Sequence, residues 1–273
     1  MKFLFCTLLL LADSVSVAAA KPRAASLDYC ADQYLLKLAD PDQILAVSRG
    51  ADKDFSYMRD EATGFARIRG TLEETLSLTP DIVLRQWGGG ANAENTFSRF
   101  GTKVVSLGFP EDFDGVKQNI RTTAAALDQT DRGEALIREL ETRLLALSAR
   151  PQSGARTLYV TPGGVTAGAH TMIDVIITAG GAINVAAAEG LSYWPSLPAE
   201  ALLLDPPEFM VAGFFISEDE DINNWSAARH PAIQKLFRER RNVSLPADMV
   251  SCAAWFSVEA AEIIANELAE PDL

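Results

Sequence analysis

The sequence predicts an α/β fold with two Rossmann-like lobes, each on a mostly parallel sheet, joined by a single long helix. Three observations predict it. Short apolar strand patterns alternate with helical patterns on both sides of the middle of the chain. The segment 131–149 between them is typical of one long helix. A short motif also recurs at the same place on each side of that helix.

The central segment, DRGEALIRELETRLLALSA, carries its own start and stop signals. Asp131 is expected as the N-cap, with Glu134 three residues later to complete a capping box. Pro151 and Gly154 end the pattern. Leucines fall on one helical face at steps of four and three: Leu136, Leu140, Leu144 and Leu147. This pattern alone fits a connector between lobes and a core helix of a single domain equally well.

Each half of the chain reads as strands that alternate with helices. In the first half we expect strands at 23–27, 44–47, 81–86 and 103–107, and helices at 30–39, 72–78, 95–100 and 112–127. In the second half we expect strands at 157–160, 208–212 and 242–245, and helices at 172–179, 199–204, 231–238 and 257–268.

The recurring motif favours two homologous lobes over one domain. The segments Glu73–Val83 and Glu200–Met210 both begin with a glutamate that precedes a proline by seven residues across a leucine-rich helix. In both segments an acidic residue follows the proline, and an apolar strand comes next. In sheets of this kind, ligands bind beyond the carboxyl ends of the strands. We therefore place the function in the cleft between the lobes.

The first twenty residues are typical of a secretory signal. Lys2 is followed by an apolar run to Ala12, too short to span a bilayer, and three alanines end at Ala20. We therefore divide the chain into a signal peptide (1–20), an N-terminal lobe (21–130), a connecting helix (131–150) and a C-terminal lobe (151–273). After export, Cys30 and Cys252 remain, either as a disulfide or as two separate buried thiols.

The composition and the absence of known motifs argue against several classes of function. A net charge of −13 argues against nucleic acid and anionic membranes as partners. The two histidines, His170 and His230, supply neither a catalytic triad nor a clustered metal site, and phosphate-loop and dinucleotide fingerprints are absent. We therefore predict no catalytic residue, no metal site and no cofactor. A secreted α/β enzyme with an unrecognised site stays open as the alternative.

Aromatic residues gather at loop positions where a cleft would open. Tyr29 and Trp87 follow expected strands, and further aromatics are Tyr193, Trp194, Phe214, Phe215, Trp225 and Trp255. Each one alone is typical of core or loop packing, but the set suits a large, flat ligand. Arg85 lies at a strand end, and Arg67 and Arg69 flank the preceding loop, which adds the option of an anionic ligand.

Several segments together resemble the substrate-binding proteins of ABC importers for cobalamin and ferric siderophores, the class III proteins with a helical backbone. They are the stretch Ser26–Gln33, the stretch Leu72–Leu84, the stretch Thr166–Gly168, and Trp194 followed six residues later by Glu200. The resemblance covers the mature chain. It implies two α/β lobes joined by one rigid helix, and a monomer in the periplasm that delivers a small-molecule ligand to an inner-membrane permease.

The resemblance also implies roles for single residues. Glu73 and Glu200 match glutamates that form salt bridges with permease arginines, although glutamates at helix starts are also stabilised by the helix dipole. Trp194 and Asp248 match cleft residues of cobalamin binders, whereas Arg67 and Gln86 replace expected aromatics. The expected ligand-binding set is Tyr29, Arg67, Arg85, Trp87, Trp194 and Asp248. These arginines favour a ferric siderophore over cobalamin; haem is the alternative, through Tyr29, Tyr57 or His170.

Overall fold

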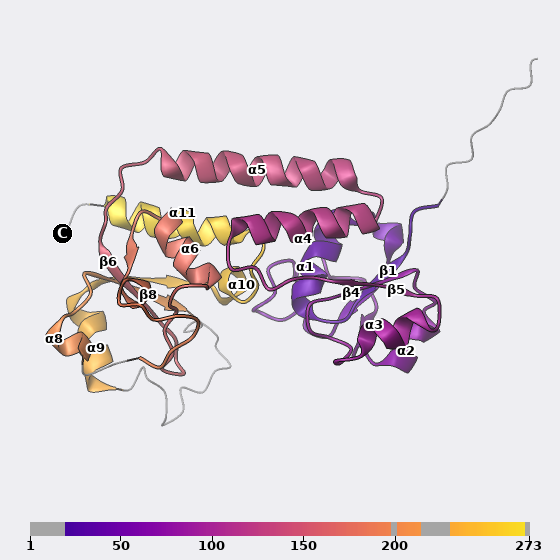
Figure 1. Ribbon diagram of the computed structural model, residues 1–273, viewed down its shortest axis with the longest axis horizontal. Helices are drawn as coiled ribbons and strands as arrows, with labels where there is room; N and C mark the ends of the chain where they lie inside the picture. The colour runs from indigo at the N-terminus through magenta and orange to yellow at the C-terminus, as the bar shows by residue number, and fades with distance from the viewer. Residues whose placement is uncertain (1–19, 198–200, 214–229, 271–273) are drawn as a thin grey trace, which may run out of the picture.

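The computed structural model describes residues 20–197, 201–213 and 230–270. Within these ranges the strands form two separate sheets, and all their pairings are parallel. The first sheet has the order β3-β2-β1-β4-β5 and the second the order β7-β6-β8-β9. The expected signal segment lies, apart from Ala20, outside the described residues. The predicted fold class, two parallel α/β lobes joined by a helix, is confirmed (Figure 1).

The strands are β1 (Ala24–Ser26), β2 (Ile44–Ser48), β3 (Arg67–Ile68), β4 (Ile82–Arg85), β5 (Lys103–Ser106), β6 (Arg156–Val160), β7 (Ile183–Asn184), β8 (Phe209–Gly213) and β9 (Arg241–Leu245). The helices are α1 (Tyr29–Leu38), α2 (Leu72–Ser77), α3 (Ala93–Ser98), α4 (Phe113–Ala126), α5 (Thr130–Ser148), α6 (Met172–Ala179), α7 (Val185–Ala188), α8 (Ala201–Leu204), α9 (Pro231–Glu239), α10 (Ala247–Val250) and α11 (Ser257–Ala269), with a 3₁₀ turn at Pro41–Gln43.

Helices cover both faces of each sheet, so the central strands β1, β4, β6 and β8 are largely buried. Along β4, Ile82 and Leu84 pack in the cluster that contains α1 and α4, whereas Val83 points to the cluster with α3. In the second lobe the same alternation separates the face under α6 and α11 from the face under α8 and α9. The face under α1 and α4 in the first lobe and the face under α6 and α11 in the second belong to one continuous core, which spans both lobes.

The repeated motif has the same structural role in both lobes. Asp81, just after Pro80, accepts a hydrogen bond from the Arg23 backbone N–H at 2.8 Å, immediately before β1. Glu208 accepts from the Arg156 backbone N–H at 2.8 Å, at the start of β6. Each acidic residue thus ties the strand that follows the proline to the first strand of its own sheet.

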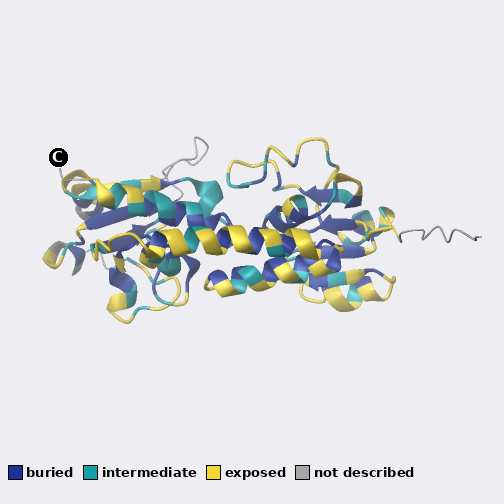
Figure 2. Cartoon of the chain, turned by 90° about the horizontal axis from the view of Figure 1, so that it is seen from above, coloured by how far each residue is buried: buried dark blue, intermediate teal, exposed yellow. Residues whose placement is uncertain are grey.

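Helix α5 spans the two lobes and packs on α4 of the first lobe and on α6 and α11 of the second (Figure 1). Its predicted apolar face is confirmed, with Leu136, Leu140 and Leu147 buried and Leu144 half-buried. Seen from above, exposed and buried residues alternate along the long helix α5 (Figure 2).

The predicted start of this helix is wrong by two residues. Gln129, not Asp131, is the N-cap, and Asp131 lies in the first turn. The Gln129 side-chain amide donates to the Gln43 side-chain oxygen at 2.6 Å, which buries the cap against the first lobe. Glu134 does not close a capping box, because its carboxylate pairs with Arg121 of α4 at 2.8 Å.

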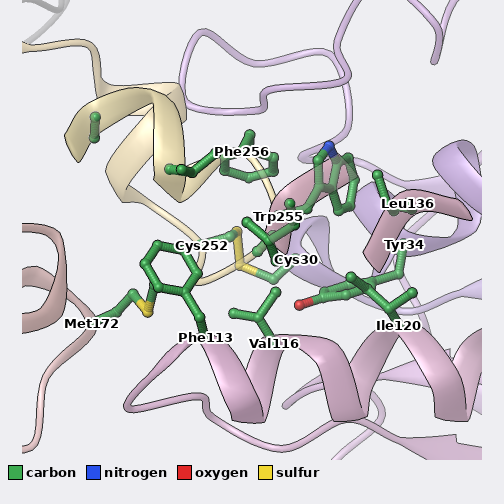
Figure 3. Packing of buried hydrophobic residues seen from close by; sticks show 14 of the residues in the cluster. Cys30, Tyr34, Phe113, Val116, Ile120, Leu136, Met172, Cys252, Trp255 and Phe256 are labelled. Atoms are coloured by element: carbon green, nitrogen blue, oxygen red, sulfur yellow. A yellow bond between two sulfur atoms is a disulfide. The ribbon is translucent and has the colours of Figure 1, made fainter. Parts of the chain in front are cut away.

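The segment that follows β9 returns from the second sheet to the first lobe. A disulfide joins Cys252 to Cys30 of α1, with the Cα atoms 5.5 Å apart. Figure 3 shows this bond among Phe113 and Val116 of α4, Met172 of α6, and Trp255. The Tyr34 hydroxyl donates to the Ala253 carbonyl at 3.0 Å. The lobes are therefore joined covalently and by packing as well as by α5.

Candidate functional site

A cavity of about 340 Å³ lies between the two lobes. It opens beyond the carboxyl ends of β1, β4 and β5, where ligands of parallel sheets bind. The described residues that line it are Tyr29, Gln86, Trp87, Phe109, Pro110, Glu111, His170, Thr171, Met172, Ile173, Ile176, Tyr193, Trp194, Val250, Ser251, Cys252, Ala253 and Ser257. Both lobes and the returning segment 250–253 thus contribute to one cleft.

The N-terminal lobe supplies a row of three aromatic rings. Tyr29 begins α1, and its ring lies edge-on to Trp87 with centroids 5.0 Å apart. Trp87 is stacked on Phe109 at 6.4 Å with an interplanar angle of 20°. Trp87 and Phe109 are 41% and 69% exposed and line the cavity, so both rings are partly accessible from the cleft. Burial, followed by the nearby charge of Asp28, raises the pKa of the Tyr29 phenol.

The C-terminal lobe supplies a second group of rings from two neighbouring loops. His170 and Tyr193 lie 5.7 Å apart, and both have left-handed backbones, with φ of 63° and 60°. The loops are joined because Gly168 donates its N–H to Tyr193 O, and Tyr193 donates its N–H to Ala169 O, both at 2.8 Å. Trp194 lies edge-on to the buried Tyr159 ring at 6.4 Å. Strained backbone of this kind is common at binding sites.

Two polar side chains meet across the mouth of the cleft. His170 Nδ1 lies 3.3 Å from Glu111 Oε2, and both side chains are largely exposed. Glu111 belongs to the loop between β5 and α4, so this contact joins the two lobes.

Three of the six predicted ligand-binding residues line the cavity, namely Tyr29, Trp87 and Trp194. The other three make contacts of their own outside the lining. Arg67 pairs with Asp52 at 3.3 Å, and Asp248 accepts from Arg59 at 2.6 Å.

Arg85 points along its own loop, where its guanidinium donates to the Trp87 carbonyl at 3.1 Å. Among the described residues that line the cavity there is no lysine or arginine. The predicted arginine-bearing cleft is therefore absent from the described lining.

The remaining predicted residues are placed as follows. Glu73 is exposed in the first turn of α2, whereas Glu200, like Phe214, Phe215 and Trp225, lies outside the described residues. Trp255 is only 6% exposed and belongs to the core, not to a loop surface.

Tyr57, one of the residues considered for haem, is stacked on Phe256 at 4.1 Å and donates its hydroxyl to Glu259 at 2.8 Å. Burial, followed by the bond to Glu259, raises its pKa.

Sequence reasoning missed Phe109 and Glu111. Both belong to the loop after β5, and a signal for them existed, because Gly108, Phe109 and Pro110 follow a strand as Trp87 follows β4. In the described part of the chain no cluster of three histidine, cysteine or carboxylate side chains has the arrangement of a metal site. Within the same residues no helix is long and apolar enough to cross a membrane.

Known proteins of the same architecture give the site its context. The fold is similar to that of the periplasmic haem-binding protein HutB of Vibrio cholerae, with a TM-score of 0.72, 19% identity, and coverage of 91% of this chain and 99% of that chain. The vitamin B12 binding protein BtuF of Vibrio cholerae has a TM-score of 0.66 and 17% identity, and the match covers 91% of this chain and 96% of that chain. An Fe3+-hydroxamate transport protein of Saccharomonospora viridis has a TM-score of 0.67 and 16% identity, and the match covers 92% of this chain and 94% of that chain.

The TM-scores show a common fold, and at these low sequence identities they show the fold alone. No curated protein sequence matches the chain significantly. The family model described as periplasmic binding protein matches residues 24–220, which is well over half of the chain. The chain therefore belongs to the periplasmic binding protein family.

Proposed function

We propose that this protein is the periplasmic solute-binding component of an ABC importer, and that its cleft captures a flat iron macrocycle of the haem type. The observation that carries the proposal is the lining of the cleft. Aromatic rings face it from both lobes, with Tyr29 and His170 among them. Rings of this kind stack on a planar π-system, and tyrosine and histidine are ligands of haem iron.

The same lining disfavours the anionic ferric siderophore that the arginines of the sequence predicted. A siderophore with carboxylate or catecholate oxygens is best held by guanidinium groups. Arg67 is paired with Asp52, and Arg85 is engaged with its own loop. Solved structures of the same fold include haem, hydroxamate and vitamin B12 proteins, so the fold is compatible with all three ligands.

The ligand is tested by what the protein retains when it is made in a bacterial periplasm. We expect a coloured protein whose bound small molecule has the mass and absorption spectrum of haem. A retained siderophore or cobalamin would overturn the haem assignment while keeping the transport role. A colourless protein that turns over esters or peptides would instead support the secreted enzyme.

Delivery to a permease is the second part of the proposal. Figure 1 shows α2 and α8 at the far ends of the two lobes, on the side of the molecule away from α5. Glu73 lies in the first turn of α2 and Glu200 directly precedes α8 in the sequence. We expect the double change Glu73→Lys and Glu200→Lys to abolish permease-dependent uptake while ligand affinity stays the same. Uptake that persists would overturn the docking role.

The protein is also proposed to be exported with a cleaved signal peptide and to act as a monomer. Removal of a signal peptide near Ala20 gives a mature protein whose mass is measured directly on periplasmic material. We expect a monomer in solution, because one chain already supplies both walls of the cleft. A precursor that keeps residues 1–20, or a stable dimer, would contradict these expectations.

A further inference from the structure

We infer that Asp28 is a positioning residue for ligand binding: its carboxylate holds the aromatic wall of the N-terminal lobe in place. The inference rests on the proposed function, in which the cleft binds a flat ligand. Asp28 itself does not line the cavity. It is 4% exposed and lies between β1 and α1, directly before Tyr29.

The two oxygens of the Asp28 carboxylate have different partners. Oδ1 accepts from the Ala31 N–H at 3.0 Å, which caps α1. Oδ2 accepts from three successive backbone N–H groups, those of Gln86 at 2.7 Å, Trp87 at 3.0 Å and Gly88 at 2.9 Å. The first contact is an ordinary helix cap. The other three clamp the loop that carries Trp87, which a cap does not require.

Three convergent N–H groups form a concave donor site that suits an anion, and a charged acceptor makes stronger hydrogen bonds than a neutral one. The loop also lies directly against the end of β1. A Cβ atom at Gly88 would be 2.4 Å from the Leu27 carbonyl oxygen, so glycine is required there. The carboxylate and this close approach fix the backbone of Trp87 while its ring stays exposed to the cleft.

The hydrogen bonds of Asp28 to the loop 86–88 are linked to the next aromatic residue, Phe109. The Gln86 side-chain amide donates to the Gly108 carbonyl at 2.6 Å. The Asn119 amide accepts from the Gly108 N–H and donates to the same carbonyl, each at 3.0 Å. Phe109 follows directly. One buried carboxylate therefore precedes Tyr29, fixes Trp87, and is linked through Gln86 to the anchor of Phe109.

The role of the clamp can be separated from that of the cap. Asparagine caps helices as well as aspartate does. However, an amide has only one acceptor oxygen, and its NH₂ group cannot accept the N–H groups of the loop. Asp28→Asn therefore serves either the cap or the clamp, but not both. Asp28→Ser is a second variant that keeps a capping hydroxyl and is too short to reach the loop.

The experiment labels the full mature chain with 5-fluorotryptophan and assigns the Trp87 ¹⁹F resonance by its loss in Trp87→Phe. We expect Asp28→Asn to shift or broaden this resonance while that of the buried Trp255 stays in place. We also expect the dissociation constant for haemin to rise about tenfold, as for the loss of one charge-assisted hydrogen bond. Ile137→Ala in α5, at a buried residue that does not line the cleft, is the control that lowers stability.

The outcomes separate the inference from the proposed function. If Asp28→Asn and Asp28→Ser both keep the wild-type Trp87 resonance, or if Ile137→Ala changes it equally, the positioning role is overturned. If the wild type does not bind haemin, the proposed ligand is overturned, and the ¹⁹F spectra still decide whether Asp28 holds Trp87.

Discussion

The disulfide between Cys30 and Cys252 should contribute several kilocalories per mole to the stability of the folded protein. It joins residues 222 positions apart, so it restricts nearly the whole unfolded chain. The chain-entropy treatment of a loop this long gives about 5 kcal/mol at 25 °C as the upper value, and native disulfides commonly contribute about 2–5 kcal/mol. Reduction of the bond should lower the free energy of unfolding by this amount.

The folded state itself should survive reduction, because other contacts hold the same segment. Tyr34 donates to the Ala253 carbonyl at 3.0 Å, and the Ser251 hydroxyl donates to the Phe55 carbonyl at 2.5 Å. Arg59 pairs with Asp248 at 2.6 Å. The segment 250–253, which lines the cleft, should therefore keep its position after reduction. We expect reduction to change the haemin affinity by less than about threefold, which is under 1 kcal/mol.

Urea unfolding of the oxidised and the reduced wild type measures the effect, followed by tryptophan fluorescence and by far-UV circular dichroism. With a slope of about 2–3 kcal/mol per molar urea, a loss of about 2–5 kcal/mol should lower the midpoint by about 1–2 M. The control is the double variant Cys30→Ala and Cys252→Ala, which should unfold at the reduced midpoint and ignore reductant. A wild-type midpoint that reductant leaves unchanged would refute the reasoning, as would an equal shift in the control.

Further predictions concern a buried carboxylate, a close approach and an ion pair. Burial raises the pKa of Asp32 to about 6. Protonation of Asp32 should therefore add about 3 kcal/mol to the free energy of unfolding below pH 4, and this gain should disappear as the pH rises through 6. Urea unfolding of Asp32→Asn should lack this pH dependence. Gly88→Ala should lower stability by about 1–3 kcal/mol and weaken haemin binding. Gly163→Ala is the control, because its added Cβ would lie 4.0 Å from Thr161 Oγ1, an ordinary contact distance. A double-mutant cycle with Arg59→Met and Asp248→Asn should give a coupling energy of about 1 kcal/mol. A coupling energy of zero would show that this ion pair does not stabilise the contact between the lobes.

The fold could be predicted because its signals are local. The leucine face of 136–147 and the alternation of strands and helices are set by periodicity, and the structure follows them. Four short elements, β3, β7, α7 and α10, were not predicted, since two to four residues carry little periodicity. Helix α8 is as short, but it lies in the repeated motif and was predicted from it. The N-cap at Gln129 was missed because its choice depends on a partner, Gln43, that is distant in the sequence.

The site was predictable in part. Tyr29, Trp87 and Trp194 line the cleft because they follow strands or lie in loops at its edge. The arginines were expected in the cleft from their place at strand ends, but ion pairing and loop hydrogen bonds decide where such long side chains point. No sequence pattern reports that Arg67 meets Asp52, or that one carboxylate holds the loop of Trp87.

The central claim is that aromatic rings from both lobes bind one planar iron macrocycle, and a titration of the purified mature protein tests it most directly. Haemin, a ferric hydroxamate, a ferric catecholate and cobalamin are each followed by tryptophan quenching and by the ligand's own absorption. We predict saturable haemin binding with a shifted Soret band, weakened at least tenfold in Trp87→Ala and in Trp194→Ala, each of which removes one ring face. Haemin binding that both variants leave unchanged, or tighter binding of another ligand, would contradict the claim.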